Sequence, residues 1–385
     1  MKLAIISSHP VQYNAPLFAL LSKKVRLKVF YTWSQKQTDL YDQDFKTKIE
    51  WDIPLLEGYD YKFVENIARN PGAHHYWGIK CPSLNKEIKA WGATHLLVFG
   101  WNYHAHLRAM WYFKGKIPVW FRGDSTLLDE KLSVKTVLRR LILKLIYQLV
   151  DKAFYVGQNN KSYFLKHGLK ESQLIFAPHA IDNDRFSMPN EVYELKAMKW
   201  REELGIKTTD FVFLFSGKFE PRKNLPFFLD SFIEFAKTLQ NNNIKLILQG
   251  SGPQEELLHK LSNNHSQVIF IPFQNQSSMP VVYRLSNVFC LPSKSETWGL
   301  TVNEAMACGR PVIVSDKVGC ARDLVNNKNG CVFKFNDKAS LFDSLNLVIK
   351  MQSGSDQYNS DQIKSHISNW SYNNIVAQII TQVNG

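Results

Sequence analysis

Two glutamates flank a loop that leads into a helix within residues 290–314. Glu296 follows an apolar run typical of a buried strand, and Glu304 comes eight residues later, inside the helix that we expect to end at Gly309. The first N–H groups of a helix lack intrahelical acceptors and favour anions such as a diphosphate. At this junction they belong to Trp298, Gly299 and Leu300. The carboxylates suit hydroxyl groups, one on a ribose and one on a sugar; an ordinary αβ unit with solvated glutamates is the alternative.

A second group of residues could neutralise phosphate charge. Lys218 and Lys223 lie five residues apart in SGKFEPRKNLPFFLDSF (216–232), between a strand-like run and a helix-like run. A lysine pair there could stabilise a diphosphate leaving group, whose negative charge grows as a glycosidic bond breaks. A pair of solvated surface lysines is the alternative interpretation.

The 290–314 segment resembles the signature of family 4 glycosyltransferases, an E-x7-E spacing followed by EAMACG-P-V. The 216–232 segment is similar to the G-R-L-x-P-E-K-G stretch of that family, although Lys218 stands where the family usually has Arg. A lysine keeps the charge there but loses bidentate phosphate binding. Weaker similarities at 246–258 and 155–186 extend the resemblance over roughly residues 150–383.

The resemblance implies a retaining, metal-independent transferase of the GT-B fold that uses a nucleotide-diphosphate sugar and no cofactor. Its catalytic residues would be Glu296, Lys218 and Lys223. Its donor-binding residues would be Glu304, Trp298, Gly299, Leu300, Gly217, Phe273 and Gln274, the last two near the nucleotide base.

Short apolar runs alternate with helix-like stretches along the whole chain, from KLAIIS at the start to RPVIVS near residue 315. This alternation predicts βαβ units and two α/β, Rossmann-like domains facing a cleft. We expect an N-terminal acceptor domain over 1–180, a linker within 178–200 and a C-terminal donor domain over 190–365. The amphipathic segment 369–385 is similar to the last helix of the family, which packs back on the N-terminal domain.

The N-terminal third departs from the common family pattern, because SSHPVQYNAPLF replaces a Gly-Gly loop after the first strand. With WDIPLLEGY (51–59) and FRGDS (121–125), this segment is similar to one subgroup of family 4. Four polar residues fall at predicted strand ends and are candidates for contacting the acceptor, or equally for a structural role. They are His9, Tyr13, Arg122 and Asp124.

Residues 131–152 form a basic amphipathic segment, in which Lys131, Lys135, Arg139 and Lys144 alternate with Leu138, Leu141, Leu145 and Leu149. Such a helix can lie on an anionic membrane, or it can pack on the core with its basic side solvated. Residues 1–190 carry 27 basic and 16 acidic residues, a balance of +11 out of the total of +13. This asymmetry favours an anionic surface as a partner.

Composition excludes several classes of protein. No run of 18 apolar residues could span a bilayer, and no signal-peptide pattern opens the chain, so we expect a cytoplasmic protein, or one held peripherally on the inner face of the plasma membrane. Asp42/Asp44 and Asp182/Asp184 match DxD, the metal–diphosphate motif of the other major glycosyltransferase fold. There the motif directly follows an apolar strand, and neither of these pairs does, so no metal is expected. The basic residues do not alternate with an exposed aromatic platform, so no nucleic acid is expected.

The combined expectation is transfer of a sugar to a glycan or lipid-linked acceptor in the synthesis of surface polysaccharide or another glycoconjugate. Two alternatives stay open. A sugar-nucleotide epimerase on the same fold would act on the donor alone. A non-catalytic protein would bind a nucleotide sugar or a nucleic acid without converting it.

Overall fold

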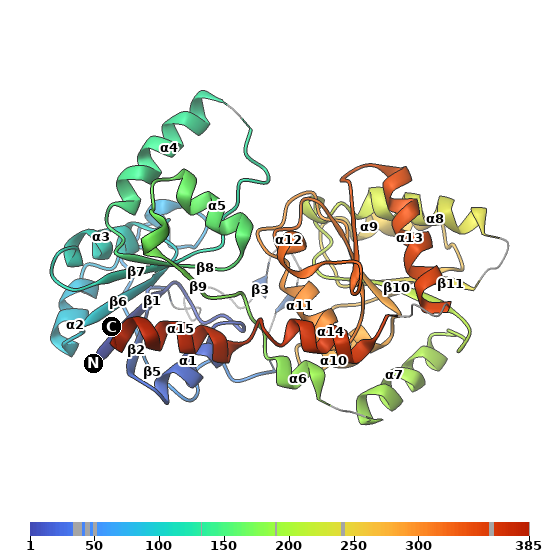
Figure 1. Cartoon of the computed structure of the whole chain (residues 1–385), viewed down its shortest axis with the longest axis horizontal. Coiled ribbons are helices and arrows are strands. Elements are labelled where there is room, and N and C mark those ends of the chain that lie inside the picture. The colour runs from blue at the N-terminus through green and yellow to red at the C-terminus, as the bar shows by residue number, and fades with distance from the viewer. Residues whose placement is uncertain are drawn as a thin grey trace. The chain divides into compact units, whose positions relative to one another are not determined.

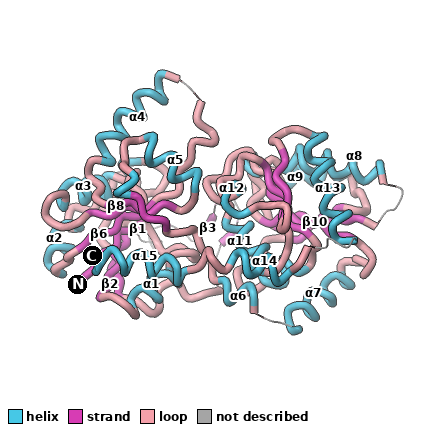
Figure 2. Tube along the Cα trace, in the orientation of Figure 1, coloured by secondary structure: helices cyan, strands magenta, loops and turns pink. Residues whose placement is uncertain are grey.

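The computed structural model describes residues 1–33, 41–42, 47–48, 52–131, 133–188, 191–239, 243–353 and 358–384. The chain divides into two units (Figure 1). Unit 1 consists of Met1–Leu40, Ile53–His179 and Ser371–Gly385, and unit 2 consists of Tyr41–Asp52 and Ala180–Trp370. In each unit the strands lie together at the centre with helices around them (Figure 2).

Unit 1 is built on a seven-stranded parallel sheet in the order β5-β2-β1-β6-β7-β8-β9. Its strands are β1 (Lys2–Ser7), β2 (Arg26–Tyr31), β5 (Asp60–Phe63), β6 (His95–Phe99), β7 (Val119–Arg122), β8 (Lys152–Tyr155) and β9 (Leu174–Phe176). Ile5 of β1 pairs with Val29 on one side and with Leu97 on the other, and all three are fully buried. Such continuous burial is typical of a parallel sheet covered on both faces.

The helices of unit 1 come from the N-terminal half of the chain and, for the last of them, from its C-terminal end. They are α1 (Ala15–Ser22), α2 (Leu84–Trp91), α3 (His104–Phe113), α4 (Val134–Tyr147), α5 (Gln158–Lys166), α15 (Tyr372–Asn384) and the 3-10 turns Tyr76–Gly78 and Glu171–Gln173. The C-terminal helix α15 packs against α1 and buries Ile375 and Ile379. The last helix of the sequence is therefore part of the first unit.

Unit 2 is built on a six-stranded parallel sheet in the order β12-β11-β10-β13-β14-β15. Its strands are β10 (Phe211–Ser216), β11 (Ile244–Gln249), β12 (Val268–Ile271), β13 (Val288–Leu291), β14 (Val312–Ser315) and β15 (Gly330–Phe333). A short antiparallel pair, β3 (Tyr41–Asp42) and β4 (Thr47–Lys48), forms a separate sheet. Both large sheets are of the Rossmann type, as the sequence predicted.

The helices of unit 2 surround its sheet. They are α6 (Asn183–Ser187), α7 (Glu191–Glu203), α8 (Leu225–Thr238), α9 (Glu255–Ser262), α10 (Met279–Arg284), α11 (Leu300–Ala307), α12 (Ala321–Leu324), α13 (Lys338–Ser353), α14 (Ser360–Ile367) and the 3-10 turn Pro221–Lys223. Helix α6 and most of α7 lie within the stretch 178–200, where the linker is expected. These helices pack against α10 and α11, and unit 2 resumes at Ala180.

Candidate functional site

The carboxyl ends of β10 and β13 meet where the strand order of unit 2 reverses. Ligands of open α/β sheets bind at such a switch point, because the loops after the two strands diverge there. The loop after β10 carries Lys218 and Lys223, and the loop after β13 carries Glu296. The fold therefore brings the two groups of residues singled out in the sequence to one edge of one sheet.

Lys223 and Glu296 are in direct contact. The Lys223 ammonium donates to Glu296 Oε2, although the two residues lie 73 positions apart. Their side chains are 13% and 12% exposed, so the ion pair is largely shielded from solvent. The two loops are also joined through the backbone, because the N–H of Lys294 donates to the carbonyl of Arg222 at 2.8 Å. Half-buried Lys218 lies in the same loop as Lys223.

The loop that carries Glu296 is held on its other side by the loop after β14. The Glu296 N–H donates to the carbonyl of Lys317 at 3.2 Å, and the Gly319 N–H donates to the carbonyl of Glu296 at 2.9 Å. A Cβ atom on Gly319 would come within 1.9 Å of the Thr297 carbonyl oxygen. Only glycine allows this approach, so the backbone around Glu296 is fixed from both sides.

Helix α11 begins directly after this loop. Gly299 precedes it with a φ of 97°, and a Cβ there would meet Leu291 at 3.0 Å and Val318 at 3.1 Å. The N–H groups of the first helical turn have no acceptor within the helix and attract anions. Trp298 contributes only its backbone to this end, because its buried indole N–H donates to Asn303 at 2.9 Å.

Glu304 lies inside α11 and is 1% exposed. Its Oε2 accepts a hydrogen bond of 2.6 Å from the Tyr283 hydroxyl, which comes from α10 and is also buried. The hydrogen bond orients the carboxylate. Tyr283 was missed in the sequence because it lies within an apolar helix-like run and has the pattern of a core residue.

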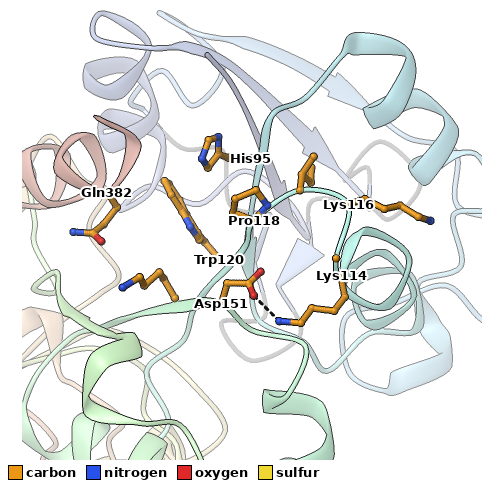
Figure 3. A pocket seen from close by; sticks show the side chains of 10 residues that line it. His95, Lys114, Lys116, Pro118, Trp120, Asp151 and Gln382 are labelled. Carbon is orange, nitrogen blue, oxygen red and sulfur yellow. Dashed lines mark hydrogen bonds and ion pairs between the residues drawn. The ribbon is translucent and has the colours of Figure 1, made fainter. Parts of the chain in front are cut away.

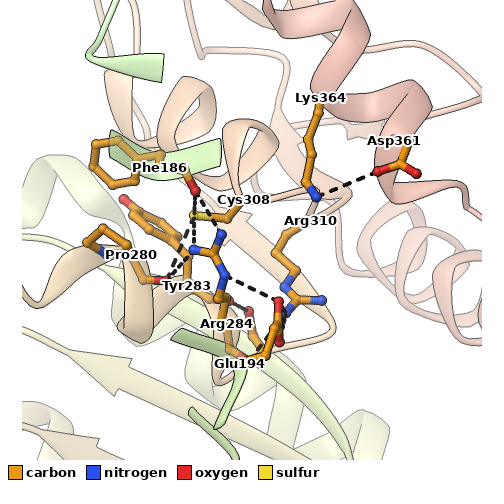
Figure 4. A network of polar contacts seen from close by, with 10 residues as sticks. Phe186, Glu194, Pro280, Tyr283, Arg284, Cys308, Arg310, Asp361 and Lys364 are labelled. Carbon is orange, nitrogen blue, oxygen red and sulfur yellow. Dashed lines mark hydrogen bonds and ion pairs between the residues drawn. The ribbon is translucent and has the colours of Figure 1, made fainter. Parts of the chain in front are cut away.

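A buried polar network fixes α10 and α11 relative to one another (Figure 4). The guanidinium of Arg284, 2% exposed as a side chain, donates to the carbonyls of Pro280 and Phe186 at 2.8 Å each and contacts Cys308 Sγ at 3.2 Å. Glu194 of α7 lies 3.2 Å from the same guanidinium. The network joins α6, α7 and the end of α11, so it holds the helix that carries Glu304.

A second series of hydrogen bonds links the carboxyl ends of β10, β11 and β12. Ser216 donates to Gln249 Oε1 at 2.5 Å, and Gln249 Nε2 donates to the carbonyl of Pro272 at 3.2 Å. Gly217 follows Ser216, with its N–H bonded to the carbonyl of Gln249 at 3.0 Å. The residues expected near the nucleotide base come next in the loop after β12; they are Phe273 and Gln274. These loops therefore extend the same sheet edge as the Lys223–Glu296 pair.

Two acceptor candidates lie directly after β1 in unit 1. His9 Nδ1 is 3.0 Å from Ser8 Oγ, and its ring packs edge-on against Trp33 at 5.3 Å. Burial lowers the pKa of His9, so the imidazole is neutral near pH 7. Tyr13 is half-buried four residues further on.

The other two candidates lie at the carboxyl end of β7, of which Arg122 is the last residue. Arg122 is 5% exposed, and its guanidinium donates to the carbonyls of Ala177 at 2.8 Å and Pro178 at 2.9 Å. Burial lowers the pKa of Arg122 to about 10. Asp124 is more accessible and lies 3.6 Å from His179 Nε2. Arg122 thus holds the backbone at Ala177 and Pro178, where the chain leaves unit 1 for unit 2. The side chain of Asp124, in contrast, can reach solvent.

Helix α4 exposes most of its apolar residues. Leu143 and Ile146 face the core, whereas six others are exposed by 47–87%: Val134, Val137, Leu138, Leu141, Ile142 and Leu145. The alternative of a core-packed helix with only its basic side in solvent is therefore wrong for Leu138, Leu141 and Leu145. Within the described ranges, no helix combines the length and apolarity required to cross a membrane.

The DxD sequences have other places in the fold. Asp182 caps α6 by accepting from the Arg185 N–H at 3.2 Å. Asp42 lies in β3, and Asp44 falls outside the described residues. In the part of the chain that the structure describes, no three His, Cys, Asp or Glu side chains come together as a metal site.

A doubly wound unit with a lysine, a carboxylate and a helix amino terminus at its switch point is typical of proteins that bind a nucleotide at that edge. Residues 197–365, which include all of these groups, match the family described as glycosyl transferases group 1. Over this segment of unit 2, the chain is therefore similar to the group 1 glycosyltransferases, which are family 4. Its two sheets match those of GT-B glycosyltransferase structures.

Curated relatives match only part of this chain. The chain is 27% identical over 183 residues to alpha-monoglucosyldiacylglycerol synthase of Acholeplasma laidlawii, covering 46% of this chain and 44% of that enzyme. It is 29% identical over 137 residues to the uncharacterized glycosyltransferase MJ1607 of Methanocaldococcus jannaschii, covering 34% of each. The alignments thus span less than half of these curated relatives.

The likeness to solved structures covers the whole chain. HepE of Anabaena, solved in complex with UDP, superposes with a TM-score of 0.75 at 17% identity, and the match covers 100% of both chains. Identity this low shows the fold alone. The fold of each unit is therefore that of GT-B glycosyltransferase structures, and the likeness includes the N-terminal third, where the sequence diverges.

Proposed function

We propose that this protein is a retaining, metal-independent hexosyltransferase that moves a sugar from a nucleotide diphosphate to an acceptor hydroxyl. The observation that carries the proposal is the Lys223–Glu296 contact beside the amino terminus of α11, at the switch point of unit 2. A shielded cation, a carboxylate and helix N–H groups supply what a leaving diphosphate and a transferred sugar need.

In the proposed complex the diphosphate lies at the N–H groups of Gly299 and Leu300 and is neutralised by Lys218 and Lys223. Glu304, oriented by its Tyr283 hydrogen bond, accepts from the ribose hydroxyls. The backbone near Phe273 and Gln274 contacts the base, and Gly217 lets the chain approach the sugar nucleotide. The UDP complex of HepE supports a uridine nucleotide as the first donor to test.

The reaction breaks the bond between the anomeric carbon and the diphosphate oxygen, and the electron pair leaves with the diphosphate. The lysines and helix N–H groups stabilise that developing charge, and Glu296 stabilises the positive charge on the sugar ring. The acceptor oxygen then attacks from the face that the diphosphate leaves. Its proton passes to a phosphate oxygen, so the anomeric configuration is retained without a side-chain nucleophile.

Unit 1 is proposed to bind the acceptor, a glycan or lipid-linked sugar in polysaccharide or glycoconjugate synthesis. His9, Tyr13 and Asp124 are the residues placed for this role, with Arg122 holding the loop behind them. The name of the Acholeplasma relative, alpha-monoglucosyldiacylglycerol synthase, supports an acceptor of lipid character.

The decisive assay incubates the protein with UDP-hexoses and a lipid-linked saccharide, and follows UDP release and the anomer of the product by NMR. Transfer with retention is expected, and Lys223→Met should lower it while Lys334→Met, at a lysine whose side chain is 76% exposed, should not. An altered sugar formed from donor alone would identify an epimerase. Donor binding without any turnover would identify a binding protein.

Helix α4 is proposed to dock on the anionic inner face of the plasma membrane. Its exposed leucines can enter the acyl boundary while Lys135, Arg139 and Lys144 face the headgroups. Glu130, an acidic residue just before the helix, is paired with Arg140 at 2.6 Å, so its charge is offset.

Sedimentation with phosphatidylglycerol vesicles tests the docking. The variant Leu141→Ser/Leu145→Ser should lose vesicle binding, whereas Leu257→Ser/Leu347→Ser, at exposed leucines of unit 2, should keep it. Equal sedimentation of the two variants would refute a role for α4.

A further inference from the structure

A pocket of about 600 Å³ opens in unit 1 at the amino ends of β6, β7 and β8 (Figure 3). It lies between the start of these strands, the loop 114–118 and Gln382 of α15. Because all strands of the sheet are parallel, this is the edge opposite to the one that carries His9 and Asp124. None of the proposed donor or acceptor residues belongs to the pocket.

The pocket carries a net positive charge. Asp151 is its acidic residue, and both of its oxygens are occupied: Oδ1 accepts from Lys114 at 2.5 Å and Oδ2 from the Val119 N–H at 2.8 Å. Lys116 and Lys152 also line the pocket, and neither has an acidic partner among the described residues. Two ammonium groups are therefore left without a counter-charge.

The structure restrains both of these ammonium groups. Lys116 Nζ lies 3.6 Å from the centroid of the Tyr112 ring, and Lys152 Nζ donates to the carbonyl of Ser172 at 3.0 Å. An ammonium has three N–H donors, so each lysine keeps donors for a ligand. Restraint of a long side chain before binding reduces the entropy lost when a ligand is bound.

The remaining walls combine polar and apolar groups. In Figure 3, Trp120 lies in the middle of the set, with the His95 ring on one side and the Asp151–Lys114 pair on the other. The centroids of Trp120 and His95 are 4.9 Å apart. Burial lowers the pKa of His95, so its ring is a neutral hydrogen-bonding group near pH 7. Pro118 adds an apolar surface and Gln382 an amide.

We propose that this pocket binds an anionic monosaccharide, a hexose that carries a phosphate or a carboxylate. The anion would lie between Lys116 and Lys152, the hydroxyls would bond to the His95 ring and the Gln382 amide, and a C–H face would cover Pro118. The volume falls in the range of about 300–1,000 Å³ found for small-molecule sites. The ligand would also join α15 to the strands of unit 1.

Isothermal titration of the full-length protein, saturated with UDP, tests the proposal with glucose 6-phosphate, glucuronate, glucose and inorganic phosphate. Binding of one or both anionic hexoses is expected, and which of them binds decides between phosphate and carboxylate. Lys116→Ala/Lys152→Ala should weaken it at least tenfold, whereas Lys86→Ala/Lys89→Ala, which removes the same charge from exposed positions on α2, should not.

Three results would overturn the inference: no binding of either anionic hexose, equal weakening in the two double variants, or binding of the hexose only when UDP is left out, which would place it in the donor site. Unchanged UDP affinity in the variants shows that they are folded. A protein that bound the hexose but not UDP would contradict the proposed transferase and leave this site intact.

Discussion

Replacing each glutamate of the proposed donor site by glutamine removes one charge and keeps the shape of the side chain. Glu304→Gln changes a residue that is 1% exposed, yet a glutamine oxygen can still accept from Tyr283 at the same place. Glu296→Gln leaves an acceptor for Lys223 in the same way. Both variants should therefore fold, and their effects should report on function.

The two substitutions should act on different steps. Ribose hydroxyls do not change charge during the reaction, so Glu304 should bind ground state and transition state equally. Hydrogen bonds to charged groups exceed neutral ones by about 1–1.5 kcal/mol, so UDP should bind Glu304→Gln about tenfold more weakly with kcat nearly unchanged. In the proposed site Glu296 would face the charge that develops on the sugar, so Glu296→Gln should lower kcat by about 10²-fold, the order found for other single electrostatic contacts.

Titration with UDP and steady-state kinetics with a UDP-hexose measure the two effects separately. Glu202→Gln, at an exposed position of α7, is the matched control and should behave as the parent. If both site variants bind UDP and turn over like the parent, the donor site is wrongly placed. If Glu296→Gln weakens UDP binding while Glu304→Gln lowers kcat, the two roles are exchanged.

Three further results are expected. Tyr283→Phe removes the 2.6 Å donor to buried Glu304, so urea unfolding should show a loss of about 1–3 kcal/mol together with weaker UDP binding; an unchanged unfolding curve would contradict the orienting role. Gly319→Ala forces the Thr297 carbonyl to move and should lower kcat at least tenfold, whereas Gly72→Ala, where an added Cβ makes only an ordinary contact of 3.7 Å with the His74 side chain, should not. Activity should survive excess chelator, and a loss that Mn²⁺ restores would refute metal-independent catalysis.

The position of the site along the sheet could be predicted from the sequence, because its markers are local. An apolar run, a polar loop, Gly299 and a helix-like segment with Glu304 define a strand–loop–helix unit wherever they occur. The Lys223–Glu296 contact could not be predicted from spacing, because it depends on β13 pairing with β10 instead of with β12, the strand before it in the chain. Strand order is decided by tertiary packing.

Helix α4 shows a different limit of sequence reasoning. Leucine and isoleucine occur around much of its circumference, so periodicity identifies a helix but not the side that is covered. The side of Leu143 and Ile146 packs on the core, and the side of Leu138, Leu141 and Leu145 is exposed. An apolar residue is buried only where another element covers it, and no helical period contains that information.

In the proposed mechanism, the Lys223–Glu296 pair would let the lysine bind the diphosphate while the glutamate stays on the sugar side of the reaction. An ammonium has three N–H donors, and Glu296 takes one, so two are left for phosphate oxygens without breaking the pair. The carboxylate also restrains the long lysine side chain, so less of the roughly 2 kcal/mol of rotamer entropy carried by lysine is lost when the diphosphate binds. In the proposed mechanism, Glu296 would thereby position the cation that stabilises the leaving group, while its own charge would stay beside the sugar. The backbone hydrogen bonds between Glu296 and the loop of Gly319 support the same contact, because they fix the loop from which Glu296 reaches Lys223.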